Sequence, residues 1–233
     1  MTRAAPGPPP LKTVVYEQIA RLGKAVASPS RLELVDLLSQ GPRTVEALAR
    51  QTGQSVAATS HHLQILRRAR LVEAAKAGLY VTYRLADPQV TDFFLHLRTL
   101  AESRLAELEQ VTRKYLTARG ALEAVGTDEL VRRVRAGETT LIDVRPREEY
   151  LAGHLPGAIS MPLRDLRTQA RHLPAGRDIV AYCRGPYCVM ALDAVDLLRR
   201  RGLRAHRLEL GVPDWRARGW RVESGAAPRA DRR

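Results

Sequence analysis

Residues 178–198 read DIVAYCRGPYCVMALDAVDLL and hold both cysteines of the 233-residue chain, Cys183 and Cys188. The apolar run before Cys183 predicts a buried strand, and the apolar spacing from Val189 to Leu198 predicts an amphipathic helix. Cys183 is therefore expected on a tight loop between a strand end and a helix start. Because free N–H groups and the helix dipole stabilise an anion there, we expect a nucleophilic Cys183 thiol with a lowered pKa.

The sequence around this loop alternates between strands and helices. Strands are predicted at residues 141–144, 159–161, 179–182 and 204–208, with helical segments between them. Such alternation is typical of a small parallel α/β sheet, in which ligands bind beyond the carboxyl ends of the strands. The Cys183 loop is expected at such an end.

The first half of the chain is predicted to be mainly helical. Two short helices, at about 45–51 and 56–69, are joined by Thr52-Gly53-Gln54, and Thr44 and Ser55 are suitable N-caps. Helix, glycine-containing turn and helix at this spacing are typical of a helix-turn-helix. The fold class is therefore a mainly α winged helix-turn-helix followed by an α/β parallel sheet.

Two further elements are expected after the helix-turn-helix. Residues 71–85 predict a β-hairpin, or wing, that turns around Lys76-Ala77-Gly78. A single long helix is then expected from about Gln89 to Thr117, and its apolar stripe is longer than a small winged domain covers alone. The stripe is therefore expected to pack on another subunit.

The predicted domain boundaries follow from shifts in composition. They are a disordered, proline-rich N-terminus at 1–10, a DNA-binding and dimerisation domain at 11–117, a linker at 118–126, an α/β domain at 127–223 and a disordered basic tail at 224–233.

Net charge and cysteine content limit the function classes. The formal net charge of +13 suits a polyanionic partner such as DNA, although an arginine-rich composition gives the same balance. Two cysteines exclude a disulfide framework, so intracellular thiols are expected. No apolar run approaches the length of a membrane span, which predicts a soluble, cytoplasmic protein without membrane contact.

The helix predicted at 56–69 has the side chains that base readout requires. Short polar groups and longer donors are expected on its early turns, at Ser55, Thr59, Ser60, His61 and Gln64. Cations that could meet phosphates are Arg67, Arg68 and, at the wing tip, Lys76. For His61, a packed imidazole is the alternative to a DNA contact.

Three segments together carry a family resemblance: Ser28-Pro29-Ser30-Arg31-Leu32-Glu33-Leu34, Val45-Glu46-Ala47-Leu48-Ala49 and Thr59-Ser60-His61-His62-Leu63-Gln64-Ile65-Leu66. With Leu71-Val72, this pattern over about residues 13–115 resembles the ArsR/SmtB family of winged-helix repressors. The resemblance implies a homodimer that binds a palindromic operator in double-stranded DNA, and repression as the mode of control.

No metal or cofactor is expected. The cysteine pair with which many members of that family bind metal is absent at residues 43–47, and the adjacent His61 and His62 point about 100° apart on a helix. Asp92 and His96 share a helix face and could form half of a metal site, but a solvated polar pair is the preferred interpretation.

The Cys183 loop has the parts that sulfur transfer needs. These are a thiolate nucleophile, backbone N–H groups for a terminal sulfur anion and a cation for an oxyanion donor such as thiosulfate. Cys183 is the nucleophile, the loop of Arg184, Gly185, Pro186, Tyr187 and Cys188 has the N–H groups, and Arg184 is the candidate cation. Polysulfides and persulfides are the other candidate donors.

Five ordered motifs over about residues 124–223 resemble the rhodanese family of sulfurtransferases. They are Leu141-Ile142-Asp143-Val144-Arg145, Glu148-Glu149-Tyr150, Gly153-His154-Leu155-Pro156-Gly157-Ala158, the Cys183 loop, and Gly211-Val212-Pro213-Asp214-Trp215 with Gly219. The resemblance implies a persulfide on Cys183. Asp143 and Arg145 are expected to brace sheet and loop, and His154 to stabilise its turn.

Two alternatives concern the loop itself. Phosphatases and arsenate reductases place an arginine six positions after the reactive cysteine, but that position here is Val189, so sulfur is favoured over phosphate and arsenate. Cys188 is either a small apolar residue at the helix start or a resolving thiol beside Cys183.

The combined prediction is a transcription regulator, with repression as the expected mode, that couples sulfur or redox state on Cys183 to operator binding. One alternative is an active thiosulfate-type sulfurtransferase fused to a DNA-binding domain without sensing. Another is an inert domain that only aids dimerisation.

Overall fold

The computed structural model describes residues 9–119, 126–174 and 176–225. The chain divides into two compact units, Met1–Thr91 and Asp92–Arg233, and each is described by itself. The predicted disordered ends lie largely outside the described residues, as does most of the predicted linker at 118–126.

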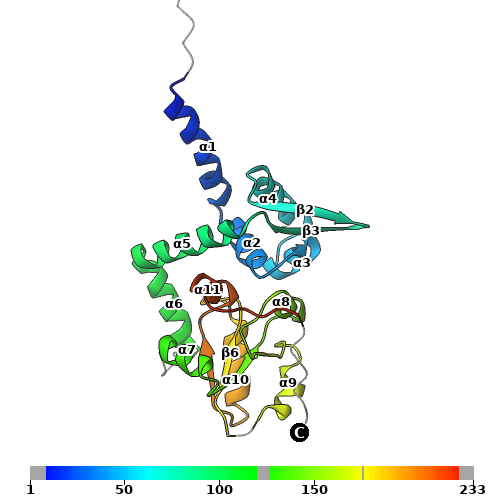
Figure 1. Ribbon diagram of the computed structural model, residues 1–233, viewed down its shortest axis with the longest axis vertical. Helices are drawn as coiled ribbons and strands as arrows, with labels where there is room; N and C mark the ends of the chain where they lie inside the picture. The colour runs from blue at the N-terminus through cyan, green and yellow to red at the C-terminus, as the bar shows by residue number, and fades with distance from the viewer. Residues whose placement is uncertain (1–8, 120–125, 175, 226–233) are drawn as a thin grey trace, which may run out of the picture. The chain divides into compact units, whose positions relative to one another are not determined.

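The first unit is a winged helix-turn-helix, as predicted (Figure 1). Its helices and strands are α1 (Leu11–Val26), α2 (Pro29–Ser39), β1 (Arg43–Thr44), α3 (Val45–Thr52), α4 (Val56–Arg68), β2 (Val72–Ala77) and β3 (Tyr80–Leu85). The strands form an antiparallel sheet in the order β1-β3-β2, and β2 and β3 are the wing. The short strand β1, which sequence reasoning missed, pairs Arg43 with Tyr83.

Local sequence explains how α3 and α4 begin and end. The Thr44 hydroxyl accepts the N–H of Ala47 and the Ser55 hydroxyl accepts the N–H of Ala58, so both predicted N-caps are confirmed. Gly53 ends α3 with φ of 67°, a left-handed conformation that favours glycine. Leu48, Leu63 and other apolar side chains bury the inner faces of the helices. As a result, the outer face of α4 remains available to solvent.

The predicted long helix at 89–117 is wrong in one respect, because the structure has two helices there. These are α5 (Pro88–Arg104) and α6 (Ala106–Ala118), and the boundary between the two compact units lies within α5. Leu105 between them is extended, with φ of −108° and ψ of 94°. No proline or glycine marks this break, and the apolar spacing continues through it, so periodicity alone could not reveal it.

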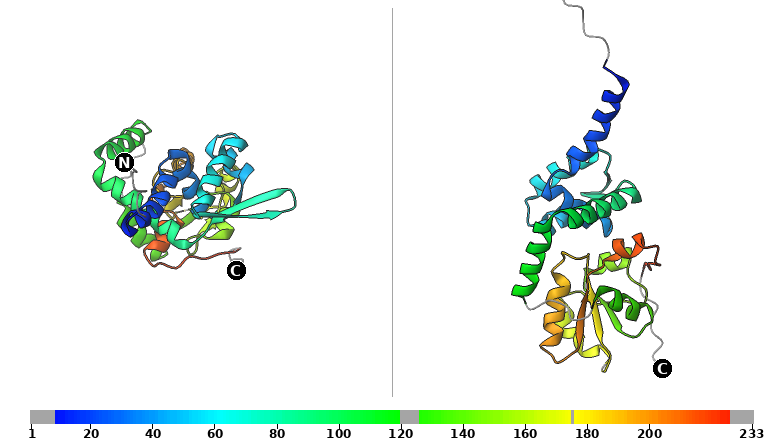
Figure 2. Two further views of the ribbon diagram at one scale, coloured as in Figure 1. Left: turned by 90° about the horizontal axis from the view of Figure 1, so that it is seen from above. Right: turned by 90° about the vertical axis from the view of Figure 1, so that its left-hand side faces the viewer.

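The core of the second unit is a parallel four-stranded sheet in the order β5-β4-β6-β7. Helices surround this sheet in Figures 1 and 2, and Figure 1 labels β6 within it. Its strands are β4 (Thr140–Asp143), β5 (Ile159–Ser160), β6 (Ile179–Tyr182) and β7 (Ala205–Leu208). Around them lie α7 (Thr127–Arg135), α8 (Arg147–Ala152), α9 (Leu166–Gln169), a 3-10 turn (Ala170–His172), α10 (Met190–Arg199) and α11 (Val212–Ala217). The predicted α/β sheet is thus confirmed. Gly126 is the N-cap of α7, and Thr127 is its first residue.

Alternation along the strands builds a separate core on each face of this sheet. On β6, Ile179 and Ala181 pack in one cluster with apolar residues of α9 and α10. Val180 and Tyr182 pack in the other cluster with residues of α7, α8 and α11. Both faces are therefore covered, as expected for a parallel sheet whose inner strand β6 is continuously apolar. Within the described residues, no helix is long and apolar enough to cross a membrane.

Candidate functional site

The loop that contains both cysteines joins β6 to α10. Cys183 directly follows β6, and α10 begins at Met190. The loop turns at Gly185, whose φ of 143° favours glycine, and the Cys188 N–H donates to the Gly185 carbonyl over 3.3 Å. On its outer side the loop packs on Gly211, where a Cβ atom would lie 2.3 Å from the Arg184 carbonyl oxygen. The predicted position of Cys183, between a strand end and a helix start, is confirmed.

The two thiols form a hydrogen-bonded pair at the N-terminus of α10. Cys183 is 1% exposed, whereas Cys188 is partly exposed between the exposed side chains of its two neighbours. The thiols hydrogen-bond each other, and the Cys183 Sγ also lies 3.4 Å from the Cys188 carbonyl oxygen. Backbone N–H groups of Arg184 and Ala191 face the Cys183 sulfur, and those of Arg184 and Met190 face the Cys188 sulfur.

The more acidic thiol of the pair is Cys188, whereas the sequence predicts a lowered pKa for Cys183. Burial raises the pKa of the Cys183 thiol well above its ordinary value, and the hydrogen bond to Cys188 raises it further. That same hydrogen bond lowers the pKa of the Cys188 thiol to about 6, against the opposing effect of burial. The amides of Arg184 and Met190 and the charge of Arg184 also favour the thiolate. The expectation of a lowered pKa for Cys183 is therefore wrong, because burial outweighs the helix N-terminus there.

Arg184 is anchored beside the loop by a buried carboxylate. Its guanidinium lies 2.7 Å and 3.1 Å from the two carboxylate oxygens of Glu149, a residue of α8 that is 1% exposed. Burial lowers the pKa of Arg184, but the hydrogen bonds to Glu149 together with the negative charges of Glu149 and the two cysteines outweigh it, so the pKa is raised. Arg184 is thus a permanent cation with a fixed partner. Its role toward an oxyanion stays a prediction.

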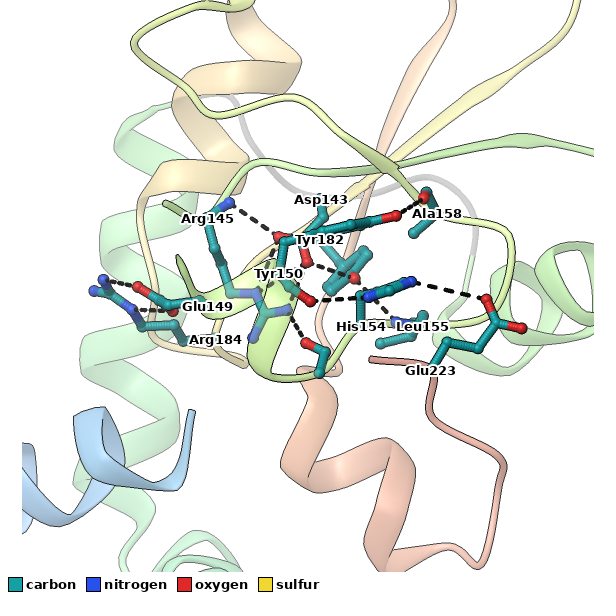
Figure 3. A network of polar contacts seen from close by, with 11 residues as sticks. Asp143, Arg145, Glu149, Tyr150, His154, Leu155, Ala158, Tyr182, Arg184 and Glu223 are labelled. Carbon is teal, nitrogen blue, oxygen red and sulfur yellow. Dashed lines mark hydrogen bonds and ion pairs between the residues drawn. The ribbon is translucent and has the colours of Figure 1, made fainter. Parts of the chain in front are cut away.

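A buried ionic network supports the strand ends behind the loop (Figure 3). Arg145 and Asp143, both fully buried, form a close ion pair with an N–O distance of 2.5 Å. The Tyr182 hydroxyl donates to Asp143 over 2.6 Å and accepts the N–H of Leu155. Burial and the Asp143 charge raise the pKa of Tyr182, which keeps this hydroxyl a donor. The network links β4 to β6 at their carboxyl ends, beside Cys183.

His154 is buried away from the two sulfurs. Its Nδ1 lies 2.8 Å from the Tyr150 carbonyl oxygen, and its ring stacks on the Tyr150 ring at 3.8 Å between centroids. Its backbone exchanges hydrogen bonds with Glu223, and its Nε2 lies 3.8 Å from the Glu223 carboxylate (Figure 3). These contacts all hold the segment in place, which supports the predicted structural role of His154.

Sequence reasoning missed two residues that hold the loop. Arg207 of β7 is 2% exposed and donates to the Pro186 carbonyl over 3.1 Å. Asp214 accepts the N–H of Gly211 over 2.8 Å and so fixes the start of α11 against the loop. The available signal for Arg207 is a charged residue inside the predicted strand at 204–208. Asp214 belongs to the segment Gly211–Trp215, whose sequence carries only a family resemblance.

The loop also contacts α5 within the second unit. The Tyr187 hydroxyl donates to the Glu102 carboxylate over 2.7 Å. Arg98, one turn earlier in α5, forms ion pairs with Glu102 and with Asp214. The loop and the start of α11 are thus joined by polar contacts to the same helix.

In the first unit, the structure describes each predicted DNA-contact residue of α4 and the wing. His61, Gln64, Arg67 and Arg68 are exposed, Ser60 is partly exposed, and Lys76 lies exposed on the wing. Ser55 is exposed, but its hydroxyl caps the helix. Thr59 is fully buried and bonds the Ser55 carbonyl over 3.0 Å, so its expected place on the outer face is wrong.

Within the described residues, no group of three or more His, Cys, Asp or Glu side chains could hold a metal ion. The Nδ1 atom of His96 lies 2.7 Å from the backbone carbonyl oxygen of Asp92. This nitrogen therefore hydrogen-bonds to the backbone of the helix on which His96 lies.

Fold and site together define a winged helix-turn-helix DNA-binding regulator joined to an α/β domain with a thiol loop. Residues 28–74 match the model of the bacterial regulatory proteins of the arsR family, and residues 126–218 match that of the rhodanese-like domain. The chain is 44% identical over 215 residues to the HTH-type transcriptional regulator Rv0324 of Mycobacterium tuberculosis, covering 92% of this chain and 94% of that protein. It therefore belongs to the ArsR-family transcriptional regulators that carry a rhodanese-like domain.

Two further relatives match the N-terminal half. The HTH-type transcriptional regulator NmtR of Mycobacterium tuberculosis is 38% identical over 81 residues, which is 35% of this chain and 68% of that protein. The solution structure of a homodimeric winged helix-turn-helix DNA-binding domain from Mycobacterium bovis is 38% identical. It covers 44% of this chain and 95% of that chain, with a TM-score of 0.40.

The packing of Gly211 gives a first prediction. In Gly211→Ala, the new Cβ would collide with the Arg184 backbone, so we expect a loss of about 1–3 kcal/mol in the stability of the second unit. Both tryptophans, Trp215 and Trp220, lie in this unit, so urea unfolding followed by tryptophan fluorescence measures it. Gly23→Ala in the first unit is the control for the glycine-to-alanine change, because its Cβ would meet open space. An unfolding midpoint of Gly211→Ala equal to that of wild type would contradict the prediction.

The lowered pKa of Cys188 gives a second prediction. The rate at which iodoacetamide alkylates Cys188 should reach half its maximum near pH 6 and fall toward zero at lower pH, since only the thiolate reacts. In Cys183→Ala the midpoint should move up because a hydrogen-bond donor is lost, whereas Cys183→Ser keeps a donor. Trypsin cleaves after Arg184 and separates the two cysteines for mass spectrometry. A midpoint near the ordinary cysteine value, about 8.5, would refute this assignment.

Proposed function

We propose that this regulator binds operator DNA as a homodimer and accepts sulfane sulfur as a persulfide on Cys183, and that this sulfur state changes its affinity for DNA. The donors are thiosulfate, polysulfides or low-molecular-weight persulfides. The observation that carries the proposal is the thiol pair facing the amides at the start of α10, in a chain whose other unit is a DNA-binding fold.

The loop has what a persulfide anion needs. A thiolate of the pair attacks the outer sulfur of thiosulfate, a new S–S bond forms, and sulfite leaves with the electron pair of the broken S–S bond. The terminal sulfur on Cys183 would carry negative charge close to the amides of Arg184 and Ala191. The cation Arg184, held by Glu149, adds favourable potential for anionic donors.

DNA binding by this chain is assigned to α4 and the wing. The exposed side chains of Ser60, His61 and Gln64 are the candidates for base edges, and Arg67, Arg68 and Lys76 are those for phosphates. Because Thr59 is buried, it is left out of this set.

A homodimer is supported by the apolar surface of α1. Leu11, Val15, Ile19 and Leu22 recur at helical spacing and are all exposed, Leu11 at 79%. An exposed apolar stripe of this kind is typical of an interface. A relative in Mycobacterium bovis with the same winged domain is described as homodimeric. Repression is proposed as the mode because several relatives are named repressors.

Helix α5 is the proposed route from sulfur to DNA. It begins at Pro88 in the first unit and continues into the second, where Glu102 accepts the Tyr187 hydroxyl of the cysteine loop. A sulfur atom added in the loop would disturb this contact, and a change in α5 would reach the DNA-binding unit through the continuous helix. Such coupling is a reciprocal free energy between two sites.

An active sulfurtransferase is the second candidate, and the match to the rhodanese-like domain favours it. Enzyme and sensor differ in turnover. Multiple turnovers of thiosulfate with cyanide that are abolished by Cys183→Ala, together with unchanged DNA binding, would establish the enzyme alone.

The sensor predicts a sulfur-dependent change in affinity. A labelled duplex, selected from random DNA by the reduced protein, is titrated by fluorescence anisotropy before and after treatment with thiosulfate or polysulfide. Wild type should weaken by about 5–150-fold, the usual range of coupling between sites, and Cys183→Ser should not respond. Val189→Ala, an exposed change next to Cys188, is the control and should behave as wild type. Equal affinity of treated and untreated wild type would refute sensing.

A further inference from the structure

The two cysteines differ in accessibility, and this difference bears on the order of sulfur transfer. Cys183 is 1% exposed and lies in the apolar cluster beneath α10, and Cys188 packs against the edge of the same cluster. Cys188 is partly exposed, between Tyr187 at 47% and Val189 at 41% exposure. A sulfur donor from solvent therefore meets Cys188 before it meets Cys183.

We propose that Cys188 is the entry thiol of this domain: it takes the sulfane sulfur from the donor and passes it to Cys183. This inference rests on the proposed function, in which Cys183 holds the persulfide, and it adds a second catalytic residue. The supporting geometry is the hydrogen-bonded thiol pair, the amides of Arg184 and Met190 facing Cys188, and the unequal exposure of the two thiols.

The first step takes place at Cys188. Its thiolate attacks the outer sulfur of thiosulfate, the S–S bond of thiosulfate breaks, and sulfite leaves with that electron pair. The product is a Cys188 persulfide anion, and the total charge is unchanged. No other oxidant or reductant is needed, because the sulfane sulfur moves without a change in its oxidation state. The hydrogen bond from Cys183 holds the reacting thiolate in place.

The second step takes place within the pair. The Cys183 proton moves to the terminal sulfur of the Cys188 persulfide, and the Cys183 thiolate then attacks that same sulfur. The S–S bond to Cys188 breaks, so Cys183 carries a protonated persulfide and Cys188 leaves as a thiolate. The proton then passes from the persulfide to Cys188, which leaves the single negative charge on the terminal sulfur of Cys183. Transfer in this direction is favoured because a more acidic thiol is the better leaving group and a less acidic thiol the stronger nucleophile. Burial then shields the persulfide on Cys183.

The test follows one sulfur atom over time. The full chain is mixed with thiosulfate or, in a second series, with polysulfide. Samples are quenched with an alkylating reagent and digested with trypsin, which gives the peptides Asp178–Arg184 and Gly185–Arg199. In wild type, the mass of one sulfur should be found first on the Cys188 peptide and later on the Cys183 peptide. Val189→Ala is the control and should show the same order.

The two single variants separate the steps. Cys183→Ser, which keeps a hydroxyl donor toward Cys188, should gain one sulfur on Cys188 and retain it. Cys188→Ser should gain sulfur on Cys183 at least about tenfold more slowly. In this variant Cys183 must attack the donor itself, and its smaller thiolate fraction, compared with that of Cys188, outweighs the greater nucleophilicity of its thiolate. Tryptophan fluorescence confirms that each variant is folded, and Cys188→Ala repeats the measurement with a second side chain.

Three outcomes would overturn the relay. Equal rates in wild type and Cys188→Ser would mean that donors reach Cys183 directly, and the proposed function would stand. Loss of two hydrogens from wild type with release of hydrosulfide would mean that Cys183 attacks the Cys188 sulfur and forms a disulfide. No sulfur on any variant would overturn the proposed function together with the relay.

Discussion

The cysteine loop depends on the buried ion pair between Asp143 and Arg145. Both side chains are fully excluded from solvent. Besides their ion pair, each forms a hydrogen bond to a different segment of the chain. Arg145 donates to the Gly153 carbonyl, and Asp143 accepts the Tyr182 hydroxyl at the end of β6. Removing one member of such a pair typically costs about 3–5 kcal/mol, although the pair adds little over apolar residues of the same volume. The ion pair therefore contributes little to net stability, and its main effect is to fix the carboxyl ends of β4 and β6, from which the loop begins.

Chemistry at the loop is decided by a competition between burial and hydrogen bonding. Both sulfurs lie near the same amides, and the amide of Arg184 faces each of them. Burial dominates at Cys183, whereas the hydrogen bond from the other thiol dominates at Cys188. Because each thiol changes the acidity of the other, the apparent pKa values belong to the pair, and Cys188 is the more acidic member. A position at a helix N-terminus therefore does not by itself determine which of two neighbouring cysteines is ionised.

Sequence reasoning succeeded where a local pattern has a local cause. The N-caps Thr44 and Ser55, the wing and the parallel sheet follow from capping and periodicity, and the structure has all of them. It failed where distant segments decide. The break at Leu105 has no proline or glycine to mark it, and Thr59 is turned inward although its neighbours are polar.

The site itself shows the same limit. Sequence placed both cysteines in one loop, but their relative acidity depends on how deeply each is buried, which no spacing reveals. The sequence predicts Arg184 as the oxyanion ligand from its place beside Cys183, yet its partner Glu149 comes from α8, far away in the sequence. Arg207 reaches Pro186 only because β7 lies beside β6 in the sheet. Tertiary contacts of this kind are beyond what a pattern predicts.

A sulfur atom added to Cys183 has little free space. The Cys183 thiol is closed off by the loop, and the loop is held by Glu149 at Arg184, Gly211 behind Arg184, Arg207 at Pro186 and Glu102 at Tyr187. Glu149, Gly211 and Arg207 belong to the packed sheet domain and resist movement, since close-packed interiors transmit strain. The contact of Tyr187 with Glu102 is a single exposed hydrogen bond, so it is the weakest of these contacts. Strain from a persulfide would therefore be released toward α5, the helix that continues from the DNA-binding unit.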